Sequence, residues 1–466
     1  MRLAQVEHAH IYAESISRHD EEYDNAIASG SFWPLSFPWS SLNAILLIVG
    51  LYIALLCPPS ASRLVRLTFW LSILSTSVWS VFRYRSPGVV GSLGVGLNGV
   101  MITAFATNFL LLRDPRQIRR ATPIYEGHKH RVNGTKPANT GNDSIWKWQG
   151  PPDKPRERLC WITDLIACLR ALKWGWDPRE GKELPPAVAF TREHSLRRHI
   201  INFCWSYLGL DIIKCIMMED PHFLGDIACP APPHLIHLLP WSLHTYRMLL
   251  PAVGIVCSIQ FYFTCWAIIQ MAPGPRILGI NGTPIMYPAI HGSPAATLSH
   301  GLRGFWGRTW HQMFRAHFQS IGDALAKFVA GLSEDKKTLR SGITICIVFA
   351  LSGILHGCGS YTMLGATRPQ DAFAFFALQP VGIGVQFVLA SLVKTYVPGH
   401  AQRVPVQMAA NLAFAFFWLW ATFWLLADDF SRGGMWLFEP VPVSFVRGLG
   451  LSSQDTRWLP HFGSPG

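Results

Sequence analysis

Charged side chains are scarce in this sequence: lysine, arginine, aspartate and glutamate together make up 15% of its 466 residues. A soluble domain carries about a quarter charged residues, and a disordered chain combines low hydrophobicity with high net charge. Here half of the residues are hydrophobic. The composition therefore argues against a disordered chain and against an ordinary water-soluble domain.

Several motifs are also missing. The ten cysteines form no C-x-x-C pair and no paired spacing, so neither a disulfide scaffold nor a zinc-thiolate site is indicated. There is no G-x-S-x-G and no P-loop, which leaves serine hydrolases and nucleotide-hydrolysing enzymes without support. The first 40 residues lack the basic start and short apolar run of a cleaved signal peptide. We therefore expect the first apolar segment to be retained.

The hydrophobic residues lie in blocks, and a membrane span needs about 17 to 25 mostly apolar residues. The candidate spans are residues 42–57, 67–82, 89–112, 200–218, 249–271, 343–364, 372–393 and 408–426. The fourth is the weakest because it carries Asp211 and Lys214, which either pair with each other or orient a substrate. The sequence predicts an all-α polytopic membrane protein with about eight transmembrane helices plus embedded or interfacial amphipathic helices.

Basic residues in the loops predict the orientation. Residues 112–198 carry 18 basic against ten acidic residues, and residues 272–340 carry eight against three, which places both loops in the cytosol and both termini opposite. The net charge of +12 then serves orientation and contact with anionic membrane lipids, so we expect no nucleic-acid partner. The sequons at Asn133, Asn142 and Asn281 fall on the cytosolic side, and glycosylation there would overturn this orientation.

The segment 299–315, SHGLRGFWGRTWHQMFR, combines aromatic and basic residues. On a continuous helix, Trp306, Trp310 and Phe314 would form an apolar stripe, with Met313 beside it. The neighbouring face would hold Arg303, Gly307, His311 and Arg315. A helix lying in the membrane interface explains the tryptophans and arginines, but it gives no reason for the pair His311-Gln312.

A histidine, His356, lies inside the predicted span 343–364, in the sequence S-G-I-L-H-G. An ionisable group at membrane depth is costly, and it usually faces a cavity, a pathway or a partner. The alternative is a neutral histidine bonded to a backbone carbonyl of a neighbouring helix. Gly353 and Gly357 on either side leave room for a close approach by another backbone or by a substrate.

The order R-G-F-W-G-R-T-W-H-Q-x-F-R, then an apolar helix with S-G-I-L-H-G, resembles the wax synthase branch of the membrane-bound O-acyltransferase superfamily. That branch includes fungal O-acetyltransferases that act on terpenoid, meroterpenoid and trichothecene hydroxyls. Residues 169–176, LRALKWGW, are similar to the R-G-I-G-W block of the family, with Ala171 in place of the usual glycine. The resemblance covers residues 164–427, and the N-terminal third matches only in hydropathy.

Hydropathy, loop charge and the resemblance together divide the chain into five parts. These are a non-cytosolic segment at 1–41, three transmembrane helices within 42–112, a basic cytosolic loop at 113–199, a wax synthase-like acyltransferase core at 200–427 and a C-terminal tail at 428–466.

The resemblance also implies an enzyme that moves an acyl group from a coenzyme A thioester to a hydroxyl, within a chamber in the bilayer. His356 takes the position of the general base, and His311 takes the second active-site position. An imidazole suits the first role because it titrates near neutral pH. Attack on the thioester builds negative charge on the carbonyl oxygen, which His311, or Gln312 beside it, could stabilise as a hydrogen-bond donor.

Coenzyme A arrives from the cytosol with its phosphates, and guanidinium groups suit phosphate. Lipid headgroups are the alternative partner of these arginines. The candidate substrate- or coenzyme-binding residues are Arg303, Trp306, Arg308, Trp310, Gln312 and Arg315. No metal site is expected, because His234, His237 and His244 have no carboxylate or cysteine at ligand spacing.

Hydropathy alone places His311 in a loop, too far from His356 for one active site. The resemblance implies that residues 299–331 enter the membrane as embedded helices, which is permitted where protein or a water-filled chamber surrounds the backbone.

The leading hypothesis is an O-acetyltransferase of the endoplasmic reticulum that needs no cofactor. It would use acetyl-CoA as co-substrate and a hydroxylated lipophilic terpenoid or meroterpenoid as acceptor, in secondary metabolism. A long-chain wax ester synthase is the alternative within the class. A transporter with His356, Asp211 and Lys214 on its path and a membrane scaffold for other enzymes are the alternatives from other classes.

Overall fold

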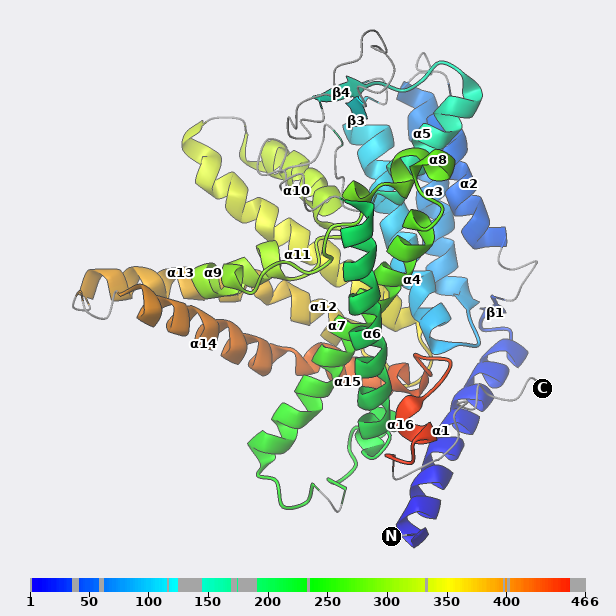
Figure 1. Ribbon diagram of the computed structural model, residues 1–466, viewed down its shortest axis with the longest axis vertical. Helices are drawn as coiled ribbons and strands as arrows, with labels where there is room; N and C mark the ends of the chain where they lie inside the picture. The colour runs from blue at the N-terminus through cyan, green and yellow to red at the C-terminus, as the bar shows by residue number, and fades with distance from the viewer. Residues whose placement is uncertain are drawn as a thin grey trace, which may run out of the picture.

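A computed structural model describes residues 2–35, 42–57, 63–114, 117–124, 145–168, 174, 191–232, 235–331, 334–396, 399 and 403–452. Almost all regular structure in this part of the chain is helical (Figure 1). The predictions for Asn133, Asn142 and His234 lie outside the described residues. So does the R-G-I-G-W-like block, of which only Trp174 is described.

The longer helices are α1 (Arg2–Ala28), α2 (Leu42–Leu56), α3 (Arg63–Arg83), α4 (Val89–Ala106), α5 (Pro155–Ala167), α6 (Arg192–Met217), α7 (Pro240–Met271), α9 (Ala295–Gly304), α10 (Arg315–Ala330), α11 (Lys337–Thr362), α12 (Pro369–Ala377), α13 (Gln379–Tyr396), α14 (Val404–Thr422) and α15 (Trp424–Arg432). Two four-residue helices, α8 (Pro275–Leu278) and α16 (Phe445–Gly448), complete the set. The strands are β1 (Trp33–Pro34) parallel to β2 (Tyr84–Arg85), and β3 (Arg120–Ile124) antiparallel to β4 (Ile145–Gln149).

Seven helical segments of the described chain are long and apolar enough to cross a membrane. They are Arg63–Arg83, Val89–Leu112, Arg192–Met217, Pro240–Met271, Lys337–Thr362, Pro369–Tyr396 and Val404–Arg432. The predicted first span, α2, has 15 residues, which is short of the 17 to 25 that a span needs. The all-α, polytopic class is confirmed, with seven long apolar helices and one short one in place of the eight predicted spans.

Helix α11 lies at the centre of the packing, against α4, α10 and α12 (Figure 1). Its contact with α4 is made by backbone: a side chain at Gly96 would collide with the carbonyl of Cys358. Leu93 and Leu97 of α4 fill the space beside Gly359 on α11. Small residues allow such close approach between membrane helices, and this contact fixes the position of the helix that carries His356.

The basic segment 113–199, between α4 and α6, is bonded to the rest of the protein through Asp164 on α5. Its carboxylate accepts hydrogen bonds from Arg120 of β3 and from the side-chain amide of Asn281. Burial raises the pKa of Asp164, and the charge of Arg120 together with both hydrogen bonds opposes that rise. The amide nitrogen of Asn281 is thus engaged, while its predicted lack of glycosylation stays a prediction.

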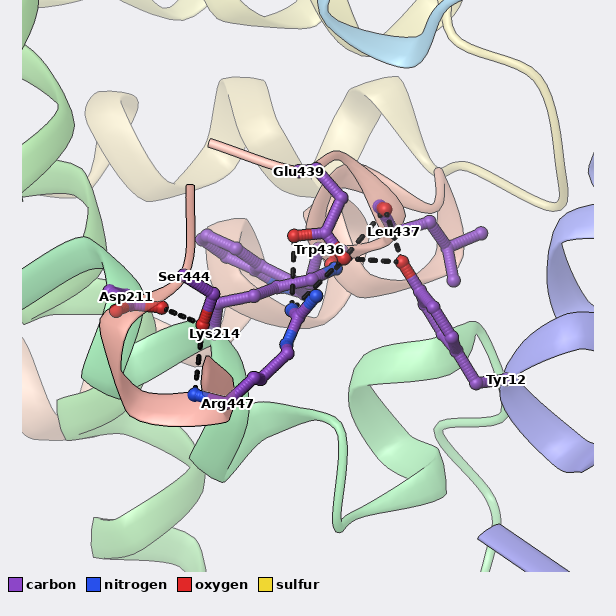
Figure 2. A network of polar contacts seen from close by, with 8 residues as sticks. All are labelled: Tyr12, Asp211, Lys214, Trp436, Leu437, Glu439, Ser444 and Arg447. Atoms are coloured by element: carbon purple, nitrogen blue, oxygen red, sulfur yellow. Dashed lines mark hydrogen bonds and ion pairs between the residues drawn. The ribbon is translucent and has the colours of Figure 1, made fainter. Parts of the chain in front are cut away.

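A buried polar network joins α6 to residues 436–447, which we call the C-terminal segment (Figure 2). Asp211 accepts from the Ser444 hydroxyl at 2.5 Å and from the backbone N–H of Val446 at 3.0 Å. Lys214 donates to the carbonyls of Trp436 at 2.6 Å and Leu437 at 3.1 Å. These bonds hold the C-terminal segment against α6.

Glu439 lies at the middle of the same network (Figure 2). Both its oxygens accept from Arg447 at 3.0 Å, and Lys214 Nζ lies 3.9 Å away. The Tyr12 hydroxyl of α1 donates to Glu439 at 3.0 Å, and burial followed by the Glu439 charge raises the pKa of Tyr12. With Asp211, the network holds two acids and two cations, so its formal charges cancel.

This network corrects the prediction for Asp211 and Lys214. The two side chains bond to the C-terminal segment and do not pair with each other. Neither residue lines the cavity that holds His356. A buried charge needs hydrogen-bonded partners of opposite sign. In the part of the chain that the structure describes, Asp211 and Lys214 therefore stabilise the fold.

Lys214→Met should destabilise the protein, because it leaves two buried carbonyls without their donor and weakens the charge balance around Glu439. We expect the melting temperature of the detergent-solubilised protein to fall by about 5 °C or more. Lys154→Met, at a position with an 80% exposed side chain, is the control. Equal melting temperatures in the two variants would contradict the structural role of Lys214.

Candidate active site

A cavity of about 450 Å³ opens between α10, α11 and the turn that precedes α10. His311 and His356 both line this cavity. The other predicted site residues that line it are Arg303, Trp306, Trp310, Gln312 and Arg315. Arg308 is not among the lining residues. The structure thus brings two histidines, 45 positions apart in the sequence, to the same cavity.

His356 is oriented by its own helix. Its Nδ1 lies 2.9 Å from the carbonyl oxygen of Ser352, one turn earlier on α11, so the proton is on Nδ1. The unprotonated Nε2 is then available as a hydrogen-bond acceptor. The imidazole stacks on Phe376 of α12, with ring centroids 4.2 Å apart. This arrangement leaves His356 able to take a proton from a ligand in the cavity.

The continuous helix considered for residues 299–315 does not form. Helix α9 ends at Gly304, a π-turn follows at Phe305–Thr309, and α10 begins at Arg315. Gly301 has φ 58° and ψ −136°, a backbone conformation that favours glycine. The chain therefore kinks before the tryptophans, and it leaves the helix after Thr309.

Two side-chain amides, which we call the amide clamp, satisfy the backbone at this kink. Gln386 of α13 accepts from the N–H of Leu302 at 2.9 Å and donates to Asn411 of α14 at 2.9 Å. Asn411 donates to the carbonyls of Leu298 at 3.0 Å and Ser299 at 3.1 Å. Unpaired backbone groups are costly away from water, so the amide clamp stabilises the break in the helix.

Trp306 fixes the π-turn against the helices behind it. Its indole N–H donates to the side chain of Gln379 at 3.1 Å. Its ring lies 5.6 Å from Phe349, 6.1 Å from Phe375 and 6.0 Å from Phe376, measured between centroids. Trp306 therefore forms part of an aromatic wall on the side of the cavity that holds His356.

Gln312 has a different role from the one predicted. Its amide nitrogen donates to the carbonyls of Trp310 at 2.7 Å and Trp306 at 3.2 Å, and its oxygen accepts from Arg315 at 2.9 Å. Arg315 also donates to the carbonyl of Gly307. The donors of Gln312 are thus used by the turn itself, which leaves His311 as the better candidate to face an oxyanion.

Sequence reasoning missed the cations on the far side of the cavity. Lys327 lies near the end of α10, and Lys337 and Arg340 lie at the start of α11; all three line the cavity. We call these three residues the cationic mouth. The excess of basic residues in 272–340 was the available signal, but only the packing of α10 on α11 shows that they face the same space as the histidines.

Comparisons with known proteins match the part of the chain that supplies most of the residues lining this cavity. Residues 287–378 match the model of the membrane bound O-acyl transferase family, and this range contains both histidines and Phe376. The chain is 22% identical to an O-mevalon transferase of Penicillium terrestre, over 71% of this chain and 73% of that protein. It is 23% identical to an acetyltransferase of Hericium erinaceus, over 63% of this chain and 72% of that protein.

A third relative, an acetyltransferase of Aspergillus terreus, is 32% identical over 36% of this chain and 54% of its own length. No solved structure matches the chain. The seven long apolar helices are those of a multi-pass membrane protein, and the acetyltransferase relatives imply an acyl donor and an acceptor. The resemblance predicted from the sequence is confirmed: the family model and these relatives support a membrane-bound O-acyltransferase.

Gly301→Ala should impair acyl transfer, because a Cβ at this position would collide with the side chain of Gln386 and the positive φ disfavours alanine. We expect turnover to fall about ten-fold or more, since small displacements of catalytic groups are costly. Gly384→Ala, on α13 with nothing within 4 Å of the added Cβ, should keep full turnover. Normal turnover by both variants would show that the kink does not position the site.

Proposed function

We propose that the protein transfers the acetyl group of acetyl-CoA to a hydroxyl of a lipophilic terpenoid or meroterpenoid, in secondary metabolism at the endoplasmic reticulum. The observation that carries the proposal is the joint position of His311 and His356 on a single cavity. Several relatives are named as acetyltransferases or O-mevalon transferases. Their names support acyl transfer to small molecules of this kind.

In the proposed reaction, the acceptor hydroxyl gives its proton to Nε2 of His356 while its oxygen forms a bond to the thioester carbonyl carbon. His311 stabilises the negative charge on the carbonyl oxygen by donating a hydrogen bond. When the carbon–sulfur bond breaks, the coenzyme A thiolate takes the proton back from the imidazolium. The products are the acetate ester and free coenzyme A, and no covalent acyl-enzyme forms.

His356→Ala should abolish turnover, because it removes the proposed base that takes the proton from the acceptor. We expect the release of free coenzyme A from acetyl-CoA, with a panel of hydroxylated terpenoids, to fall by about a hundred-fold or more. His194→Ala, at an exposed position at the start of α6, is the control for loss of a histidine. Comparable turnover by His356→Ala and the wild type, at equal abundance in membranes, would remove His356 as the base.

The cationic mouth supports coenzyme A as the donor. Lys327, Lys337 and Arg340 come from the predicted cytosolic loop and line the same cavity as the histidines. Coenzyme A carries its phosphates at one end and the thioester at the other, so phosphates at the mouth place the acyl group toward His356. Basic side chains provide the charge-assisted hydrogen bonds that phosphate accepts.

The double variant Lys337→Gln with Arg340→Gln should weaken donor binding. We expect the KM for acetyl-CoA to rise about ten-fold or more, as for the loss of one or two charged contacts. The KM for acetylpantetheine, which lacks the nucleotide phosphates, should not change. Lys154→Gln, in the other basic loop, is the control. An equal rise in KM for both donors would contradict phosphate binding by these residues.

The aromatic wall supports a short acyl group. Phe376 stacks on His356, and Trp306 and Phe349 line the cavity beside it. Large rings next to the base limit the space for the acyl chain. The limited space favours transfer of an acetyl group over transfer of a long acyl chain by a wax ester synthase.

Phe376→Ala should widen the acyl specificity. We expect the wild type to prefer acetyl-CoA over octanoyl-CoA, and the variant to shift the ratio of kcat/KM toward octanoyl-CoA by about ten-fold. Phe417→Ala, with an exposed ring on α14, should leave the ratio unchanged. A wild type that already prefers octanoyl-CoA, or a variant with an unchanged ratio, would contradict this role of Phe376.

A further inference from the structure

A second cavity, of about 460 Å³, lies among α2, α3 and α4. It belongs to the N-terminal part of the chain, outside the range that matches the family model. Its walls are aliphatic, aromatic or glycine, and its polar residues are Tyr52, Ser80, Tyr84 and Asn98. No charged residue lines it. The cavity is therefore suited to an uncharged and mainly apolar ligand.

Asn98 is the unusual residue of this wall. It lies in the middle of the spanning segment Val89–Leu112, and its amide makes no hydrogen bond to any described residue. Tyr52 and Ser80, in contrast, donate to Thr163 and to the carbonyl of Thr76. An amide without a partner in an apolar environment is costly, and polar groups at membrane depth usually face a substrate or a cavity. The amide of Asn98 is thus available to a ligand.

Gly94 provides the space beside this amide. It lies one turn before Asn98 on the same face of α4, and both residues line the cavity. A Cβ built on Gly94 would meet only the amide nitrogen of Asn98, at 3.9 Å. The wall therefore has a recess next to its polar group, which a larger side chain at position 94 would fill without displacing the backbone.

The cavity is elongated along the membrane helix. Its lining residues on α4 run from Val90 to Phe105, which corresponds to about 22 Å of helix. Asn98 lies near the middle of that length, away from the headgroup region at either end. A phospholipid has its polar group at headgroup depth, so its acyl chain would leave the amide of Asn98 unpaired.

The second cavity and the active-site cavity lie on different sides of α4. Met101 lines the second cavity and packs in a cluster with Phe314 and Leu355, which line the active-site cavity. The other contact is the backbone approach of α4 to α11 at Gly96. One helix and one layer of side chains thus separate the two cavities.

We propose that the second cavity binds the lipophilic acceptor as it arrives from the bilayer, with the acceptor hydroxyl hydrogen-bonded to Asn98. This inference rests on the proposed function, because that function defines the acceptor as an uncharged hydrocarbon body with a hydroxyl group. The side-chain amide both donates and accepts, which suits a hydroxyl. The site concentrates the acceptor next to α4 and does not take part in the chemical step.

The test uses the full chain in phosphatidylcholine nanodiscs and a photoreactive diazirine analogue of farnesol, a terpenoid alcohol. Labelled peptides are mapped by mass spectrometry. We expect labelling within residues 89–106, and competition by unlabelled farnesol but not by the hydrocarbon farnesene. Asn98→Leu and Gly94→Phe should lower this labelling about five-fold or more, as for the loss of one hydrogen bond or of the space itself.

Two variants serve as controls for folding and for chemistry. Gly384→Phe places the same ring on a spanning helix where nothing lies within 4 Å of the added Cβ, and it should keep full labelling. Asn98→Gln keeps an amide and should retain more labelling than Asn98→Leu. The KM for the acceptor should rise in Asn98→Leu, and kcat at saturating acceptor should not change.

Unchanged labelling in both Asn98→Leu and Gly94→Phe would overturn the site. Equal competition by farnesene and farnesol would also overturn the proposed acceptor site. Such a result would indicate that hydrocarbon of any kind fills the second cavity. Acetyl transfer measured in the same nanodiscs separates the two proposals. Labelling without acetyl transfer counts against the proposed function alone, and acetyl transfer without specific labelling counts against the second cavity alone.

Discussion

The backbone contact between α4 and α11 supports most of the functional architecture. In a membrane the lipid tails are as apolar as the helices, so association depends on close packing more than on burial of apolar surface. Gly96 lets α4 approach the backbone of Cys358, two residues after His356. One face of α4 thus positions the proposed base, while another face lines the second cavity. Helix α4 therefore lines the second cavity and supports α11, which lines the active-site cavity.

The active-site turn shows a second constraint, the need to pair backbone groups where a helix is interrupted. The chain breaks between Gly301 and Arg315, and side-chain amides replace the missing backbone bonds. Gln386 and Asn411 act from other helices, and Gln312 acts from within the turn. This explains why side-chain amides gather around a site whose proposed chemistry belongs to histidine.

The sequence predicted the helical membrane fold and the resemblance to the family, because apolar length and residue order are local properties. The resemblance also placed His311 and His356 at one site, and the structure brings both to one cavity. The sequence could not predict the kink, since Trp306, Trp310 and Phe314 fit a helical period equally well. It also left Gln312 open as an alternative to His311 for the oxyanion, because the carbonyls that accept from Gln312 lie together only once the turn has formed. The cationic mouth and Phe376 were missed for the same reason: packing between distant segments brings them to the cavity.

The network around Glu439 has a consequence for the order of assembly. Asp211 and Lys214 are made more than 200 residues before the C-terminal segment that supplies their partners. At typical rates of synthesis this delay is about 10 to 45 s. During that time α6 holds two ionisable groups that lack their final partners, which weakens its insertion relative to an apolar helix. Completion of the chain therefore changes α6 from a marginal membrane segment into a stable one, and an incomplete chain remains open to recognition by the quality-control machinery of the cell.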